Sequence, residues 1–263
     1  MREAGKRVAR VLIELTRMAK PGVTLLELNN HAEKLTLEMG AKLAFKGYMG
    51  YAHALCTSVN EQVVHGIPSK RVLADGDILG LDFGLIYQGF YGDSAVTLGI
   101  GRVSEEAKKI MQVTKDSLYA GIAASKEGNT LKDVARAIED TVAPNGYGIV
   151  REFVGHGIGT KLHEDPQVPN YAAGASNLKL RAGMTIAIEP MVNQGTHQVS
   201  VLADKWTAVT RDGKLSAHYE HTIAVTDGEP EILTLWEPVL RELGPAGSLN
   251  EKGAYGERGS NPS

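Results

Sequence analysis

The sequence contains a single cysteine, Cys56, among 263 residues. No disulfide can form within the chain, which excludes the small secreted scaffolds that depend on disulfides and suits a reducing compartment. No apolar run approaches the ~20 residues that a membrane-spanning helix needs. The N-terminal residues also lack the apolar core of a signal peptide. We therefore expect the protein to reside in the cytoplasm.

An excess of charge of one sign is also lacking, since 28 Lys and Arg oppose 31 Asp and Glu and the formal net charge is −3. This balance produces no field that would attract nucleic acid or an anionic membrane, so we expect neither as a partner. A basic face for transient ribosome contact could form from Lys6, Arg7, Arg10, Lys42 and Lys46. A solvated helix surface is the simpler interpretation, and we expect a monomer.

The length fits one domain, because single domains that mix helices and strands often reach ~250 residues. Apolar residues make up 43% of the chain, which is ordinary for a globular protein. After Leu243 the sequence becomes rich in Gly, Ser, Asn and Pro. We therefore predict one domain over residues 1–240 and a disordered tail over residues 244–263.

Two segments recur at a nearly constant offset, which indicates an internal duplication. The segment 22–28 resembles 128–134, shifted by 106 residues, and 76–82 resembles 183–189, shifted by 107. The first pair has the pattern of a capped helix and the second that of an apolar strand. Either match alone could arise by chance, but the common offset makes chance a weaker explanation.

The duplicated strands end in carboxylates, Asp82 and Glu189. Burying an ionised carboxylate alone costs several kcal/mol or raises its pKa, and a metal ion removes that cost. For either residue alone, a strand-end charge that reaches water is the simpler alternative. Two related halves, about 1–103 and 104–240, would bring both carboxylates towards a pseudo-twofold axis, and such a seam is a common place for a ligand.

The stretch from Asp82 to Asp93 predicts a β-hairpin. If its loop is centred between Tyr87 and Gln88, the two aspartates lie directly opposite one another, with Cβ atoms ~4.5–5.5 Å apart. If the turn is centred one residue later, they are diagonal neighbours. Two carboxylates placed on one face repel each other unless a cation lies between them, so Asp93 strengthens the prediction of a metal.

Three further residues are candidates for the same chemistry. His156 lies between glycines, which let backbone approach closely and leave the imidazole accessible. His163 follows in the same glycine-rich loop, and two histidines there favour a function over a structural role. Glu220 precedes a β-branched run, and the residues alone leave its role undecided.

Seven segments, taken in order and spacing, resemble the type I methionine aminopeptidases. They are NEQVVHGIP (60–68), LDF (81–83), GFYGD (89–93), GHGIG (155–159), HEDP (163–166), IEPM (188–191) and YEHT (219–222). The resemblance runs from about residue 1 to about residue 235. It implies an α+β pita-bread fold, in which two pseudo-symmetric halves surround a central curved antiparallel sheet with helices on its outer face.

The resemblance also implies a dinuclear metal site and its ligands. The five implied ligands are Asp82, Asp93, His156, Glu189 and Glu220. Asp82 would chelate the first metal, His156 and Glu189 would hold the second, and Asp93 and Glu220 would bridge both. Four carboxylates and one imidazole suit Mn²⁺, Fe²⁺ or Co²⁺, and Zn²⁺ also fits.

The implied activity is that of a metallo-exopeptidase which removes the initiator methionine from nascent proteins when the second residue is small. Hydroxide shared by two metals ~3.5–4 Å apart would attack the first peptide carbonyl. Glu189 would accept the proton of the water and pass it to the leaving amine. His163 would bond the carbonyl oxygen or the amide, and His65 would assist at the amide nitrogen.

The implied methionine pocket uses aromatic and soft side chains, which suit a thioether. Its members are Tyr48, Tyr51, Cys56, Leu162, Met191 and Trp206, and His65 and His163 would also face the substrate. General packing is the alternative for Tyr48, Tyr51 and Cys56. Met49 stands where the family frequently has a histidine, and Leu162 where it frequently has an aromatic residue, so the shape of the pocket departs from the family pattern.

Other pita-bread proteins are the competing interpretations. Enzymes that cleave before proline, or that hydrolyse dipeptides, usually carry a large N-terminal domain for which this chain has no room. Type II methionine aminopeptidases usually carry an insertion in the second half, which the compact stretch 189–220 disfavours. A non-catalytic pita-bread protein that binds RNA or a partner would commonly have lost metal ligands, whereas all five are present here.

Overall fold

The computed structural model describes residues 1–236, so the predicted tail over residues 244–263 lies outside the described residues. The helices in this range are α1 (Arg2–Met18), α2 (Leu25–Glu38), α3 (Glu105–Ala124) and α4 (Leu131–Val142), with short 3-10 helices η1 (Tyr48–Gly50) and η2 (Ala143–Asn145). The strands are β1 (Lys42–Leu43), β2 (Cys56–Val59), β3 (Gln62–Val64), β4 (Ile78–Tyr87), β5 (Phe90–Gly99), β6 (Gly148–Ile149), β7 (Gly155–Gly157), β8 (Glu164–Val168), β9 (Thr185–Ile188), β10 (Met191–Asn193), β11 (Val199–Val201), β12 (Ala208–Thr210), β13 (Ser216–His218), β14 (Glu220–Ala224) and β15 (Glu231–Ile232).

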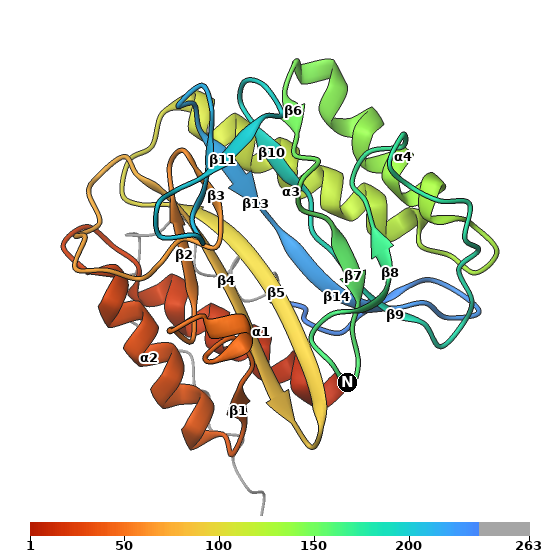
Figure 1. Cartoon of the computed structure of the whole chain (residues 1–263), viewed down its shortest axis with the longest axis horizontal. Coiled ribbons are helices and arrows are strands. Elements are labelled where there is room, and N and C mark those ends of the chain that lie inside the picture. The colour runs from red at the N-terminus through yellow and green to blue at the C-terminus, as the bar shows by residue number, and fades with distance from the viewer. Residues whose placement is uncertain (237–263) are drawn as a thin grey trace, which may run out of the picture.

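The main sheet is antiparallel and runs in the order β1-β4-β5-β14-β9-β7-β8, with β2 beside β4 and β15 beside β14. Smaller sheets, β13-β10-β6 and β11-β12-β3, adjoin it. Helix α1 packs on β4 and β5, while α3 contacts α4, β5, β9, β13 and β14. The helix pairs therefore lie on one side of the strands (Figure 1). This arrangement confirms the predicted α+β class.

Apolar burial fixes the first helix against the long hairpin. Val8, Val11, Leu12 and Leu15 recur at helical spacing and are fully buried. Burying each such side chain contributes roughly 1.5–3 kcal/mol relative to exposure. The opposite face carries exposed charges, so only one orientation of α1 on β4 and β5 buries the apolar stripe.

The duplicated segments form matching structures. Thr24 and Thr130 are the N-caps of α2 and α4, and both complete reciprocal capping boxes. The amide of Gly22 donates to the carbonyl of Leu73, and the amide of Gly128 donates to that of Leu180 in the same way. In the second pair of duplicated segments, 76–82 and 183–189, turns at Gly76 and Gly183 come immediately before β4 and β9. Equivalent hydrogen bonds thus recur at offsets of 106 and 107.

The hairpin follows the second of the two predicted registers. Tyr87 pairs with Phe90, so Gln88 and Gly89 form the two-residue turn. Their φ angles are +50° and +81°, and a type I′ hairpin turn needs positive φ at both central residues. A turn centred one residue earlier would have required positive φ of Tyr87, a bulky residue that disfavours it. The directly opposed placement of the two aspartates is therefore wrong.

Candidate metal centre

Strand register places the implied ligands on one face of the main sheet. Asp82 on β4 and Glu220 on β14 both pair with Ala95, which lies between them on β5. Paired residues in antiparallel strands point to the same face, and so do residues two apart on one strand. Asp93 precedes Ala95 by two residues and therefore joins the same face. Three adjacent strands thus present three carboxylates together, around a residue small enough to leave room for them.

The remaining two ligands reach this face from β9 and β7. His221 pairs with Ile188, so extending that register by one residue places Glu189 opposite Glu220. His156 pairs with Ala187, which precedes Glu189 by two residues and so shares its face.

The distances show that these side chains converge. Ligand atoms of Asp93, His156 and Glu220 all lie within 4.8 Å of one another. His156 Nε2 lies 3.5 Å from Glu189 Oε1. Asp82 and Asp93 are close enough for their carboxyl groups to influence each other's pKa directly. The structure therefore brings together all five residues that the resemblance implied.

The carboxylates are buried without the partners that carboxylates usually have. Among residues 1–236, Oδ1 of Asp82, Oδ1 of Asp93 and Oε1 of Glu220 accept no hydrogen bond. Burial raises the pKa of Asp82 to about 7 and that of Glu189 to about 8. Burial and neighbouring carboxylates raise the pKa values of Asp93 and Glu220 well above their ordinary range. A cation at this point would remove the cost of holding these groups ionised.

His156 offers a lone pair to the same point. Its Nδ1 lies 2.9 Å from the carbonyl oxygen of Gly157, which can only accept, so Nδ1 carries the proton. Burial, with the nearby His163, lowers the pKa of His156 to about 4, so the ring is neutral at pH 7 and Nε2 is unprotonated. An unprotonated Nε2 and a carboxylate oxygen then face each other. The donor set therefore fits divalent metal.

Residues 1–227 match the model of metallopeptidase family M24. The chain belongs to this family. A methionine aminopeptidase of Clostridium acetobutylicum is 50% identical over 238 residues, which cover 90% of this chain and 95% of that protein. Methionine aminopeptidase 1 of Bacillus subtilis is 48% identical over 234 residues, covering 89% of this chain and 94% of that protein.

A solved structure of methionine aminopeptidase from Thermotoga maritima matches with a TM-score of 0.87 at 47% identity, covering 89% of this chain and 94% of that one. These similarities confirm the resemblance that the seven motifs carry, and with it the pita-bread fold. The family and the converging ligand group together indicate that this M24 chain uses divalent metal.

His163 lies beside the ligand His156, and His65 lies close to His163 and His218. The ring of His163 makes an edge contact with that of His156, with centroids 4.3 Å apart, and Tyr48 Oη lies 2.7 Å from His163 Nδ1. His65 adopts a φ of +59°, an uncommon conformation that clusters at functional sites. Burial lowers the pKa of His65 to about 4 and also lowers that of His163. Both rings are therefore neutral at pH 7.

The predicted methionine pocket divides between two apolar clusters. Tyr48, Tyr51, Cys56, Leu162 and Trp206 belong to one of them, which we call the Tyr51 cluster. Met191 belongs to another, the Met191 cluster, which also contains Phe153. His65 makes edge contacts with Trp206 and Phe153 and so lies between the clusters. Met49, a predicted departure at the rim, is 82% exposed and does not line an interior surface.

Two members of the Tyr51 cluster have definite surroundings. Tyr51 Oη donates towards the carbonyl oxygens of Leu55 and Gly66, at 3.0 and 3.2 Å, which is a structural role for its hydroxyl. Cys56 on β2 pairs directly with Asp82 on β4. Cys56 therefore shares the face of the metal ligands, and its buried thiol has a pKa well above its ordinary value.

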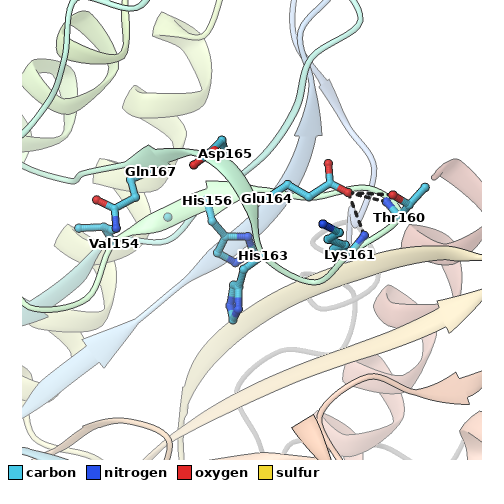
Figure 2. A pocket seen from close by; sticks show the side chains of 9 residues that line it. Val154, His156, Thr160, Lys161, His163, Glu164, Asp165 and Gln167 are labelled. Carbon is cyan, nitrogen blue, oxygen red and sulfur yellow. Dashed lines mark hydrogen bonds between the residues drawn. The ribbon is translucent and has the colours of Figure 1, made fainter. Parts of the chain in front are cut away.

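A cavity of about 750 Å³ opens beside the imidazoles of His156 and His163. Strands β7 and β8 and the loop between them line it (Figure 2). Glu164 Oε1 accepts hydrogen bonds from the amides of Thr160 and Lys161 at 2.8 Å, which fixes the shape of that loop. The cavity adjoins both imidazoles, and none of the four carboxylate ligands lines it.

The motifs did not single out His218 and Asn170, which the structure places at the centre. His218 Nε2 lies 3.6 Å from Glu189 Oε2. Asn170 is buried, and its Nδ2 donates to the backbone carbonyl of Glu189 at 3.1 Å. A period-two pattern could have flagged His218, because it precedes Glu220 by two residues. Nothing in the sequence around Asn170 distinguishes it from a loop asparagine.

Three of the five cations of the possible basic face pair with neighbouring acids. Lys6 and Arg7 both pair with Glu3, and Lys46 pairs with Glu33. These pairs fit the solvated helix surface that the sequence favoured. Within residues 1–236, no helix is both long enough and apolar enough to cross a membrane.

Proposed function

We propose that this chain is a dinuclear metal-dependent aminopeptidase that removes N-terminal methionine from nascent polypeptides when the second residue is small. The single observation that carries the proposal is the convergence of four carboxylates, two of them buried and two part-buried, and one neutral imidazole on one face of the sheet. Support for the substrate comes from relatives near 50% identity that are named methionine aminopeptidases.

Asp82, Asp93, His156, Glu189 and Glu220 are the residues that would hold the metals. Four negative charges nearly balance two divalent ions, which supports a dinuclear site. Bound divalent ions would lower the pKa of water and polarise the peptide carbonyl. Mn²⁺, Fe²⁺, Co²⁺ and Zn²⁺ all suit this donor set.

The protein's own groups would then handle protons and position the peptide. Glu189, which the strand register places opposite Glu220, would accept a proton from water and pass it to the leaving amine. His163, whose Nδ1 faces Tyr48, uses Nε2 towards the carbonyl oxygen or scissile amide of the peptide. His65 assists at the amide nitrogen.

Hydrolysis of a Met-Gly peptide and a Met-Leu peptide, after reconstitution with each of the four metals, tests the proposal. Met-Gly should be cleaved and Met-Leu should resist, because a small second residue is required. An N-acetylated Met-Gly peptide should also resist, since the free α-amino group takes part in binding. No cleavage of Met-Gly with any metal would refute the function, and a divalent-ion titration showing no stoichiometric binding would favour a non-catalytic pita-bread protein.

The methionine pocket can be tested at Trp206. Its ring makes edge contacts with Tyr51 and His65, with centroids 5.0 and 6.3 Å apart. Trp206→Leu should raise KM for Met-Gly by about 10-fold. The change removes apolar contact area from the thioether site, and this area contributes roughly 1–2 kcal/mol of binding free energy. Phe90→Leu is the control, because the Phe90 ring is exposed. Trp236 is unsuitable for this purpose because its ring is buried. An unchanged KM would place methionine elsewhere.

Cytoplasmic location, a monomeric state and transient ribosome contact belong to the same proposal. The single buried cysteine suits a reducing compartment. Co-sedimentation of the native chain with ribosomes at low and high salt would test the contact, since one made by exposed cations weakens with salt.

A further inference from the structure

His218 occupies a tightly fixed position at the end of β13. It is 3% exposed, and it pairs with Met191 on β10. Thr97 Oγ1 donates to the carbonyl oxygen of His218 at 2.8 Å and accepts from its amide at 3.0 Å. Both the amide and the carbonyl of His218 are thus fixed, so the imidazole can move only by rotation about its side-chain torsions.

The imidazole of His218 points at the carboxylate of Glu189. Its Nε2 is buried and has no hydrogen-bond partner among residues 1–236. Nε2 lies 3.6 Å from Glu189 Oε2, while His156 Nε2 lies 3.5 Å from Glu189 Oε1. The two oxygens of one carboxylate therefore face two different imidazoles. Asp82 is near enough to raise the pKa of His218, and His218 is near enough to His65 to lower the pKa of His65.

The two imidazoles are free to play different parts. His156 carries its proton on Nδ1, so its Nε2 is an acceptor. A gap of 3.6 Å exceeds an N–H···O hydrogen bond by only a few tenths of an ångström. A buried polar atom without a partner costs free energy, so closing this gap is favourable if His218 Nε2 carries a proton.

We propose that His218 is a positioning residue that donates its Nε2–H to Glu189 Oε2 and thereby turns Oε1 towards His156 and the metal site. The inference rests on the proposed function in assigning Glu189 as metal ligand and base. His218 needs no change of charge for this role, because its neutral Nε2–H tautomer is sufficient. Residues that orient a metal ligand commonly affect affinity by 10–100-fold when removed.

The matched variants His218→Gln and His218→Leu separate donation from packing. Glutamine keeps an N–H of similar reach, whereas leucine keeps apolar volume only. Titration calorimetry with Co²⁺ should show affinity reduced ~10–100-fold in the leucine variant and within ~3-fold of native in the glutamine variant. The kcat for a Met-Gly peptide should follow the same order with KM little changed. His31→Leu in α2 is the control and should match native in both measurements.

Equal Co²⁺ affinity and kcat in native and His218→Leu would overturn the inference. Equal damage in the glutamine and leucine variants would also overturn it, by assigning His218 a packing role. These outcomes differ from a failure of the proposed function, in which the native chain itself would not cleave Met-Gly. The affinity comparison remains valid in that case.

The native protein supplies a test that does not depend on folding of the leucine variant. Nitrogen-15 spectra of the imidazoles in Zn²⁺-loaded protein should show a protonated Nε2 for His218, assigned by its absence in His218→Gln. An unprotonated Nε2 would overturn donation.

Discussion

Asp82 and Asp93 are diagonal neighbours across the β4–β5 hairpin, since Asp82 pairs with Ala95 and Asp93 pairs with Gly84. This offset places the two carboxylates on the same face of neighbouring strands. Glu220 on β14 joins that face from the other side of β5, because it also pairs with Ala95. The type I′ turn at Gln88 and Gly89 sets this offset. The diagonal arrangement leaves space for a cation to contact both carboxylates, which is the basis of the first prediction.

Asp93→Asn should reduce divalent-ion affinity and kcat/KM by at least ~100-fold, because a direct ligand matters more than the groups that orient it. Folding should survive, since an amide resembles the protonated carboxyl that the raised pKa of Asp93 favours before metal binds. Calorimetric titration with Mn²⁺ and thermal unfolding measure the two effects. Exposed Asp140→Asn is the control, and native affinity in Asp93→Asn would contradict the bridging role.

The metal-free protein should lose stability as pH rises from 6.5 to 8. The pKa values of Asp82 and Glu189 are raised to about 7 and about 8, so the folded state binds more protons than the unfolded state in this window. Stability therefore falls with pH, by on the order of 2 kcal/mol for these two groups. Below pH ~6.5 the lowered pKa values of His65 and His156 contribute the opposite slope.

Urea unfolding of chelator-treated protein at pH 6.5 and 8 measures this dependence. Saturating Mn²⁺ should abolish the loss at pH 8, because metal binding requires the ionised carboxylates and therefore strengthens with pH. Asp82→Asn should show a smaller loss than native when metal-free. A metal-free protein that becomes more stable between pH 6.5 and 8 would contradict the burial of ionisable carboxyl groups.

Tyr48→Phe should lower kcat about 10-fold with a smaller effect on KM, because His163 loses the hydroxyl 2.7 Å from its Nδ1 that fixes its ring. Steady-state hydrolysis of a Met-Gly peptide distinguishes the two parameters. Tyr147→Phe, which lies in a different cavity, is the control. A rise in KM with unchanged kcat would instead make Tyr48 a wall of the methionine pocket.

Thr24→Ala and Thr130→Ala should each lower the free energy of unfolding by about 1 kcal/mol, because each removes an N-cap. The double variant should be additive within about 0.5 kcal/mol, since the two caps share no hydrogen bond. Ser104→Ala should cost less, because that cap lacks the reciprocal bond of a capping box. Urea denaturation measures all four proteins. Unequal losses for Thr24 and Thr130 would argue against equivalent roles in the duplicated segments.

The sequence predicted the local features because their causes are local. Apolar spacing indicates α1, the Thr-x-x-acid pattern indicates the caps of α2 and α4, and the repeat offset relates Asp82 to Glu189. The hairpin was also predictable. Its alternation fits two turn centres that differ by one residue and so left the register open, although the earlier centre would need an unfavourable positive φ at Tyr87. The φ angles of Gln88 and Gly89 decide between them.

The composition and motifs of this chain determined its class, its duplication and, through resemblance, its five ligands. Only the tertiary structure decided that these ligands converge, because Glu220 reaches Asp82 only when β14 pairs with β5, where Glu220 contacts Ser94, 126 residues away in the chain. The same holds for His218 and Asn170, which neighbour Glu189 only once β13 and the loop before β9 are packed. The period-two spacing of His218 and Glu220 can place both residues on one face, but no local pattern shows that Glu189 reaches that face, since this depends on which strands pair.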